Sequence, residues 1–86
     1  MPSTTATVGS AVGLHARPAT IIAEAVADTG NTVTLGLEGA EPVDAGSALM
    51  IMTLGAEKGT RVVVTADDPG TLDAIVALVE KDLDAD

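Results

Sequence analysis

The chain has 86 residues and a mass of 8.5 kDa, enough for one small domain and too little for a large self-contained enzyme. Cysteine is absent, which excludes disulfide bonds, thiolate zinc sites, iron–sulfur clusters and thiol nucleophiles. Four basic and thirteen acidic residues give a formal net charge of −9, and Phe, Tyr and Trp are absent. The chain therefore lacks the positive charge and the aromatic rings with which proteins bind nucleic acids.

The cellular location follows from the same features. The first residues lack the positive charge and apolar stretch of a secretory signal, and no apolar run approaches the ~20 residues of a membrane span. A net negative charge also disfavours anionic membrane surfaces. We therefore expect a single domain over residues 1–86 that is cytoplasmic and monomeric and binds neither nucleic acid nor membrane.

The first half of the chain predicts two strands around a helix, and then an edge strand. β-branched residues in 5–8 predict the first strand. From Pro18 to the stop signal at Gly30, helical spacing predicts an amphipathic helix that buries Ala19, Ile22, Ala23 and Val26. Alternation in 32–37 predicts a half-buried strand with Val33, Leu35 and Leu37 on one side, and 41–44 predicts a short edge strand because it contains proline.

The second half predicts two helices with a strand between them. Ser47 is a good N-cap residue for a short apolar helix over 48–54. The β-branched run 61–66 is the strongest strand signal in the chain. A last amphipathic helix, with Pro69 near its first turn, is expected from the spacing of Leu72, Ile75, Val76, Val79 and Leu83.

The resulting order, β-α-β-β-α-β-α, predicts an α+β fold. Alternating strands need cover on one face, and amphipathic helices need cover along one stripe. Helices packed on one face of an antiparallel sheet satisfy both needs.

The single histidine stands in Gly13-Leu14-His15-Ala16-Arg17-Pro18-Ala19, between the first strand and the first helix. A helix N-terminus binds anions through its N–H groups and its partial positive charge, and Pro18 places that terminus near His15. A neutral imidazole is a good nucleophile near pH 7, and the guanidinium of Arg17 suits phosphoryl oxygens. These residues predict a phosphoryl-accepting site, although an ordinary surface histidine beside a solvated arginine explains the spacing equally well.

This seven-residue stretch resembles the active-site signature of the HPr family, the histidine-containing phosphocarriers of the bacterial sugar phosphotransferase system. The segment 47–55 is similar to the second helix of that family, which begins with a regulatory serine. The length and the element order agree with the family over essentially the whole chain. The resemblance implies an open-faced β-sandwich, in which a four-stranded antiparallel sheet carries three helices on one face.

The resemblance also implies roles for particular residues. His15 would take a phosphoryl group on Nδ1 from phosphorylated Enzyme I and pass it to Enzyme IIA proteins for sugar uptake. Arg17 would steady the group, and the backbone N–H groups of Ala16 and Arg17 would donate to its oxygens. The protein would then be a carrier and not a complete enzyme. With one histidine, no cysteine and no Asp-rich loop of calcium-binding spacing, we expect no metal and no cofactor.

The segment after Gly46 adds two predictions. Ala48, Leu49 and Met52, with Leu54, are candidate docking residues, although helical spacing predicts that roughly half of them are buried. Ser47 is either only an N-cap or, as in many relatives from Gram-positive bacteria, the target of a serine kinase. Gly46 and Met50 differ from residues common in those relatives, which disfavours the kinase.

Two other functions fit parts of the sequence. A regulatory HPr-like module, or a paralogue of a nitrogen-related branch, would keep His15 and Arg17 but control partner proteins. A hydrolase with His15 as the base for Ser10 or Ser47 is disfavoured, because the sequence supplies neither an orienting acid nor a nucleophile elbow.

Overall fold

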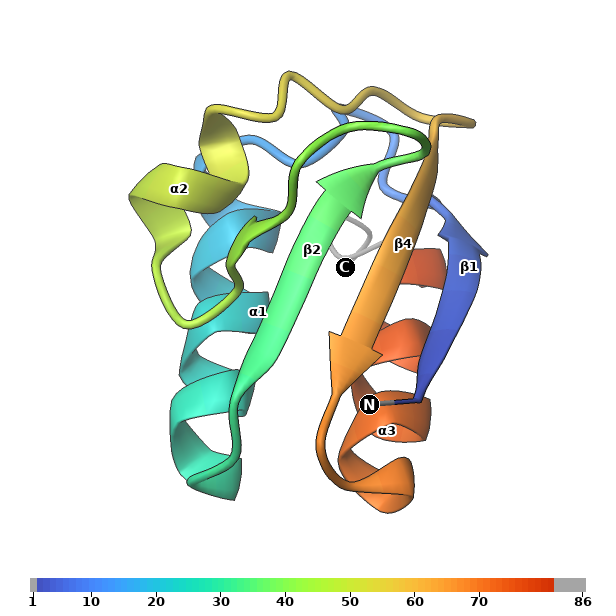
Figure 1. The fold of residues 1–86 in the computed structure, drawn as a ribbon. Coiled ribbons are helices and arrows are strands. Elements are labelled where there is room, and N and C mark those ends of the chain that lie inside the picture. The colour runs from blue at the N-terminus through green and yellow to red at the C-terminus, as the bar shows by residue number, and fades with distance from the viewer. Residues whose placement is uncertain (1, 82–86) are drawn as a thin grey trace.

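The computed structural model describes residues 2–81, and its element order is the predicted one. Figure 1 shows the elements, which are β1 (Ser3–Thr7), α1 (Ala16–Thr29), β2 (Val33–Leu37), β3 (Val43–Asp44), α2 (Ala48–Met52), β4 (Arg61–Ala66) and α3 (Pro69–Glu80).

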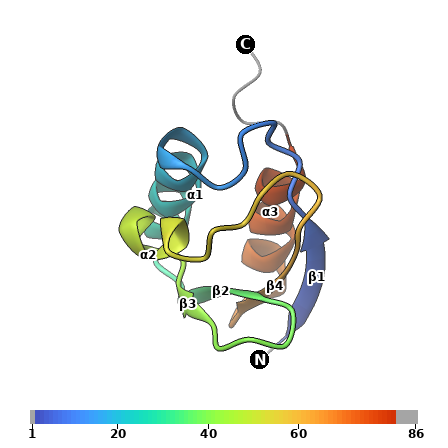
Figure 2. The same cartoon turned by 90° about the horizontal axis from the view of Figure 1, so that it is seen from above.

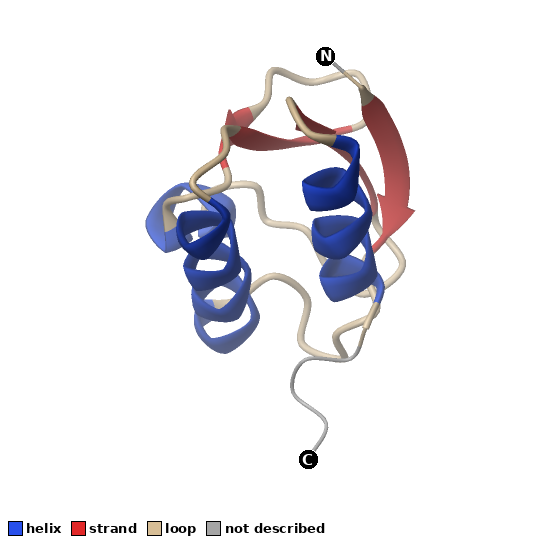
Figure 3. Cartoon of the chain, turned by 90° about the horizontal axis from the view of Figure 1, so that it is seen from below, coloured by secondary structure: helices blue, strands red, loops and turns tan. Residues whose placement is uncertain are grey.

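The strands form one antiparallel sheet in the order β1-β4-β2-β3. The interior strand β4 pairs with β1 and with β2, so that Val62 stands opposite Ala6 on one side and Leu37 on the other. The edge strand β3 is shorter than predicted, because Pro42 has no N–H to donate to a ladder. All three helices lie on one side of the sheet (Figures 2 and 3), which confirms the α+β open-faced sandwich.

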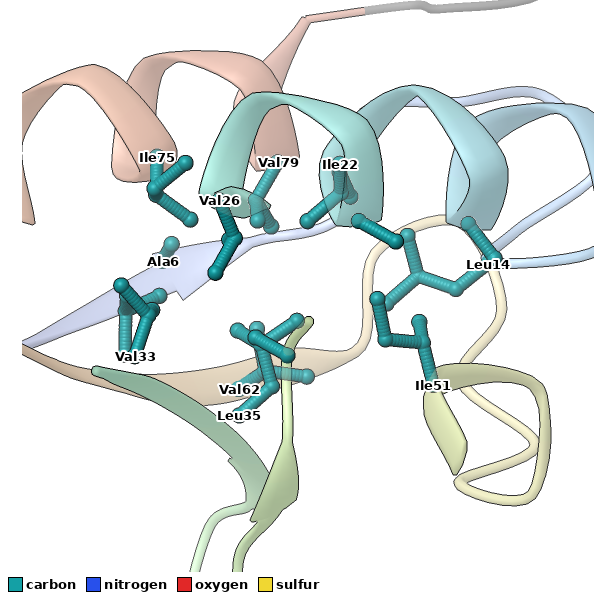
Figure 4. Packing of buried hydrophobic residues seen from close by; sticks show 14 of the residues in the cluster. Ala6, Leu14, Ile22, Val26, Val33, Leu35, Ile51, Val62, Ile75 and Val79 are labelled. Carbon is teal, nitrogen blue, oxygen red and sulfur yellow. The ribbon is translucent and has the colours of Figure 1, made fainter. Parts of the chain in front are cut away.

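The core lies between the sheet and the helices, and aliphatic side chains fill it (Figure 4). The sheet contributes Ala6, Val33, Leu35, Val62, Val64 and Ala66, α1 contributes Ala19, Ile22, Ala23 and Val26, and α3 contributes Leu72, Ile75 and Val79. Every residue predicted to be buried in α1 is buried. Leu37 and Val76, also predicted for the buried faces, are half-buried against this core. Each fully buried Val, Leu or Ile side chain stabilises the fold by about 1.5–3 kcal/mol, so these aliphatic residues form the core without any aromatic ring.

The first helix begins at Ala16, two residues before the proline that marked its predicted start. Pro18 is therefore the third helical residue, where an N–H would not serve the helix. Arg17 is helical although a following proline disfavours that conformation. This earlier start makes His15 itself the N-cap residue, which decides the geometry of the site.

Other boundaries also differ from the predicted ones. The first strand begins and ends earlier than 5–8. The second helix ends at Met52 and not at Leu54, because the Leu54 N–H donates to a carbonyl only three residues back, which makes a tighter turn. The last helix ends where Lys81 adopts an extended backbone. Leu83, which we expected on that helix, lies outside the described residues.

Candidate functional site

His15 is exposed at the amino end of a 14-residue helix. Its backbone is extended, with φ −86° and ψ −163°, and its carbonyl accepts the N–H of Ala19 at 2.9 Å, as the first bond of the helix requires. Its side chain makes no capping hydrogen bond. The imidazole is therefore open to solvent and does not cap the amino end of the helix.

Buried contacts fix the residues immediately before the histidine. The Leu14 N–H donates to the carbonyl of Ala56 at 2.8 Å, and the buried Leu14 side chain lies beside Ile51 of α2 (Figure 4). Gly13 has φ +75°, and a Cβ there would overlap the Ala56 carbonyl oxygen and lie 2.8 Å from the Cα of Glu57. Only glycine fits this conformation and this contact together. The exposed side chain of His15 thus follows directly after two buried residues, Gly13 and Leu14, whose contacts fix the backbone at this point.

Arg17 and two backbone donors share the same end of α1. Ala16 and Arg17 are the first two residues of the helix, and both are exposed. First-turn N–H groups point out of a helix at its amino end, where the dipole is positive, and no acidic side chain stands in this first turn. His15, Ala16 and Arg17 are therefore the N-cap and the first two residues of α1, at a place that favours an anion.

Ser47 is the N-cap of α2, as predicted. Its side-chain oxygen accepts the Met50 N–H at 3.3 Å, and the residue is half-buried. The other serine weighed as a nucleophile, Ser10, is buried, and its hydroxyl donates to the carbonyl of Lys81 at 3.4 Å. Since both hydroxyls have these structural bonds, the geometry gives the hydrolase reading no support.

The structure divides the candidate docking residues into one exposed residue and three partly buried ones. Leu49 is 70% exposed, whereas Ala48, Met52 and Leu54 are only partly buried and pack against the core. The helix α2, which carries Leu49, packs beside α1, whose first residues form the site (Figure 1). Only one of the four candidates is therefore a large, mostly exposed apolar side chain.

Sequence reasoning missed two exposed apolar residues. Val12 is 51% exposed in the loop that leads to His15, and Met50 is 40% exposed on α2. The exposure of Val12 could have been suspected from the sequence, because it is an apolar residue outside every stretch of helical or strand periodicity. Met50 had none, because a five-residue helix is too short for its spacing to identify the buried face.

The described part of the chain offers few other sites. Within residues 2–81, no group of three or more His, Cys, Asp or Glu side chains could hold a metal ion, and no helix is long and apolar enough to cross a membrane. An open groove of about 380 Å³ lies at the opposite end of α1, between Val26, Asn31, Pro42 and Asp44. That groove contains none of the predicted site residues.

Comparison with known proteins identifies the family. The sequence model described as "PTS HPr component phosphorylation site" matches residues 2–81. The chain belongs to this HPr family of the phosphotransferase system. It is 41% identical over 73 residues to phosphocarrier protein HPr of Streptomyces coelicolor, with 85% of this chain and 78% of the relative covered. It is also 33% identical over 78 residues to phosphocarrier protein NPr of Proteus mirabilis, with 87% of each covered.

Solved structures of the HPr family share the fold. HPr-C-His from Thermoanaerobacter tengcongensis superposes with a TM-score of 0.87 at 27% identity, covering 100% of this chain and 99% of that one. Phosphocarrier protein HPr from Bacillus anthracis str. Ames gives a TM-score of 0.82 at 25% identity, covering 91% and 95%. The predicted resemblance is confirmed, and with it the phosphocarrier class of the HPr and NPr proteins.

Proposed function

We propose that this HPr-family protein carries a phosphoryl group on His15 from phosphorylated Enzyme I to Enzyme IIA proteins of a sugar phosphotransferase system. The proposal rests on the position of His15, an exposed N-cap residue whose imidazole makes no capping bond and which stands two residues before Arg17 in the chain. The protein is then a carrier that acts in the cytoplasm as a monomer, and its own chemistry needs no cofactor.

Transfer requires one bond to form while another breaks. The Nδ1 lone pair of neutral His15 attacks phosphorus, and the bond between phosphorus and Enzyme I breaks as the new N–P bond forms. In the second step a histidine of Enzyme IIA attacks the same phosphorus, and the His15 N–P bond breaks. Arg17 and the N–H groups of Ala16 and Arg17 stabilise the charge on the phosphoryl oxygens, and the helix dipole adds to this effect.

A shallow site suits a carrier with two successive partners, because each partner must reach the same nitrogen. Within residues 2–81, the exposed large apolar side chains are Leu49 and Met50 on α2 and Val12 on the loop before His15. They are the docking residues we propose, together with the partly buried Ala48 and Met52 as their support. Methionine is flexible and polarisable, which suits contact with more than one partner surface.

Ser47 is the residue that we propose for regulation if a serine kinase acts on this protein. A phosphate there would lie at the start of α2, near Leu49 of the docking surface. It would also compete with the present cap bond to the Met50 N–H. Incubation with a bacterial HPr kinase and ATP tests this role, with Ser47→Ala as the control that must stay unmodified.

The central test is phosphorylation from phosphoenolpyruvate through Enzyme I, followed by intact mass at neutral pH. Enzyme I of Streptomyces coelicolor is a suitable donor, because its HPr is similar to this chain. We expect one added phosphoryl group that is lost in acid and absent from His15→Ala. Absence of any addition to the wild type with several Enzyme I preparations would reject the carrier function.

The NPr relative supports a second candidate, a nitrogen-branch or regulatory phosphocarrier. Such a protein would use His15 and Arg17 in the same way but would not phosphorylate sugar-specific Enzyme IIA. Complementation of sugar uptake in a strain that lacks HPr distinguishes the two. Restored uptake that needs His15 supports the sugar carrier, and phosphorylation without restored uptake supports the regulatory branch.

A further inference from the structure

The loop between β1 and His15 is attached to the carboxyl end of α3. The Gly9 N–H donates to the carbonyl of Val79 at 3.0 Å, and the completely buried Ser10 hydroxyl donates to the carbonyl of Lys81 at 3.4 Å. Figure 2 shows this loop, in blue, passing the end of α3 before it enters α1. The loop thus binds carbonyl groups that the last turn of a helix leaves without partners of its own.

Gly9 permits this attachment because the two backbones are in close contact. A Cβ on Gly9 would overlap the Glu80 carbonyl oxygen and lie 2.6 Å from its carbonyl carbon. The φ of Gly9 is not in the left-handed region, so the constraint is the contact alone and not the conformation. Any side chain here would have to push the loop away from α3.

The attachment leads directly to the histidine. The Ser10 carbonyl accepts the Gly13 N–H at 2.9 Å, which closes a turn over residues 10–13. Leu14 then bonds to Ala56, and His15 follows. The loop that precedes His15 is therefore hydrogen-bonded at two places, to the segment after α2 and to the end of α3.

We propose that the carboxyl end of α3 positions the imidazole of His15 for phosphoryl transfer, with Gly9 and Ser10 as the positioning residues. This inference rests on the proposed function. In-line transfer needs the attacking nitrogen aligned with phosphorus, and a displacement of about 1 Å can slow such a reaction about 100-fold. Neither residue touches the phosphoryl group, so both act through the position of His15.

Steady-state transfer from Enzyme I tests the proposal in Gly9→Ala and Ser10→Ala. We expect kcat to fall about tenfold or more in Gly9→Ala and about threefold in Ser10→Ala, because the first displaces the loop and the second only loosens it. KM should stay unchanged, since Arg17 and Leu49 remain in place. Gly70→Ala is the matched control at the other end of α3, where a Cβ meets only the Asp68 carboxylate at 3.2 Å. It should transfer at the wild-type rate.

An NMR measurement gives an independent readout. The Leu14 amide and the His15 amide and imidazole signals should shift in Gly9→Ala and stay in place in Gly70→Ala. Wild-type kcat together with unchanged His15 signals in both loop variants would overturn the proposal. If Gly9→Ala does not fold, Ser10→Ala decides by the same criteria. If the wild type accepts no phosphoryl group, the proposed function fails, and the His15 signals still decide whether α3 positions the imidazole.

Discussion

Replacing Gly13 by alanine is the sharpest test of how the site is built. Gly13 is buried with φ +75°, a conformation that costs an L-residue about 1–2 kcal/mol. The new Cβ would also overlap the Ala56 carbonyl oxygen and lie 2.8 Å from the Cα of Glu57, and such overpacking typically costs about 1–3 kcal/mol more. We therefore expect Gly13→Ala to lower the free energy of unfolding by about 2–5 kcal/mol.

Gly39→Ala separates the two contributions. Gly39 has φ +82° but no atom within 4 Å of the added Cβ, so it should lose only the conformational part, about 1–2 kcal/mol. Urea denaturation followed by far-UV circular dichroism measures both variants, since the chain has no aromatic residue for fluorescence. Displacement of the loop should also slow phosphoryl transfer in Gly13→Ala only. Equal destabilisation of the two variants would refute the contact with Ala56.

Three further predictions concern the core, a helix cap and the docking surface. Leu35→Ala removes a completely buried side chain and should lower the free energy of unfolding in urea by about 2–5 kcal/mol; a loss below about 1 kcal/mol would contradict the observed burial. Asp68→Ala removes the carboxylate that caps α3 through the Thr71 N–H at 2.9 Å, so thermal and urea unfolding should show a loss of about 1 kcal/mol, and an unchanged value would exclude the cap. Leu49→Ala alters a side chain that is 70% exposed, so the free energy of unfolding should change by less than about 0.5 kcal/mol while KM for Enzyme I rises about fivefold. An unchanged KM would show that Leu49 is not part of the docking surface.

The sequence predicted the fold well where local patterns carry the information. Ile22 and Val26 are buried because helical spacing places them on one face, and the run 61–66 forms a strand, as its β-branched residues predict. Gly30 ends α1 with φ 70°, as a left-handed residue after a helix should. These features depend on near neighbours in the chain, which a single sequence displays.

Features that depend on distant residues could not be predicted in this way. α1 starts at Ala16 and not at Pro18, where the sequence predicted it. The tertiary contacts of Leu14 hold the preceding loop and override the tendency of Pro18 to keep Arg17 out of the helical conformation. The bond between Ser10 and the end of α3 joins residues 71 positions apart and leaves no local pattern. The exposure of Met50, next to the buried Ile51, likewise depends on how α2 packs against the core.

Because His15 is the only histidine in the sequence, the NMR signals of its two ring nitrogens report directly on whether it carries the phosphoryl group. The measurement is NMR of protein with 15N-labelled histidine during incubation with Enzyme I and phosphoenolpyruvate. We expect the Nδ1 signal to shift and to gain coupling to phosphorus in step with the added mass, and both changes to reverse when Enzyme IIA is supplied. An added phosphoryl group that leaves both ring nitrogens of His15 unchanged would contradict the account.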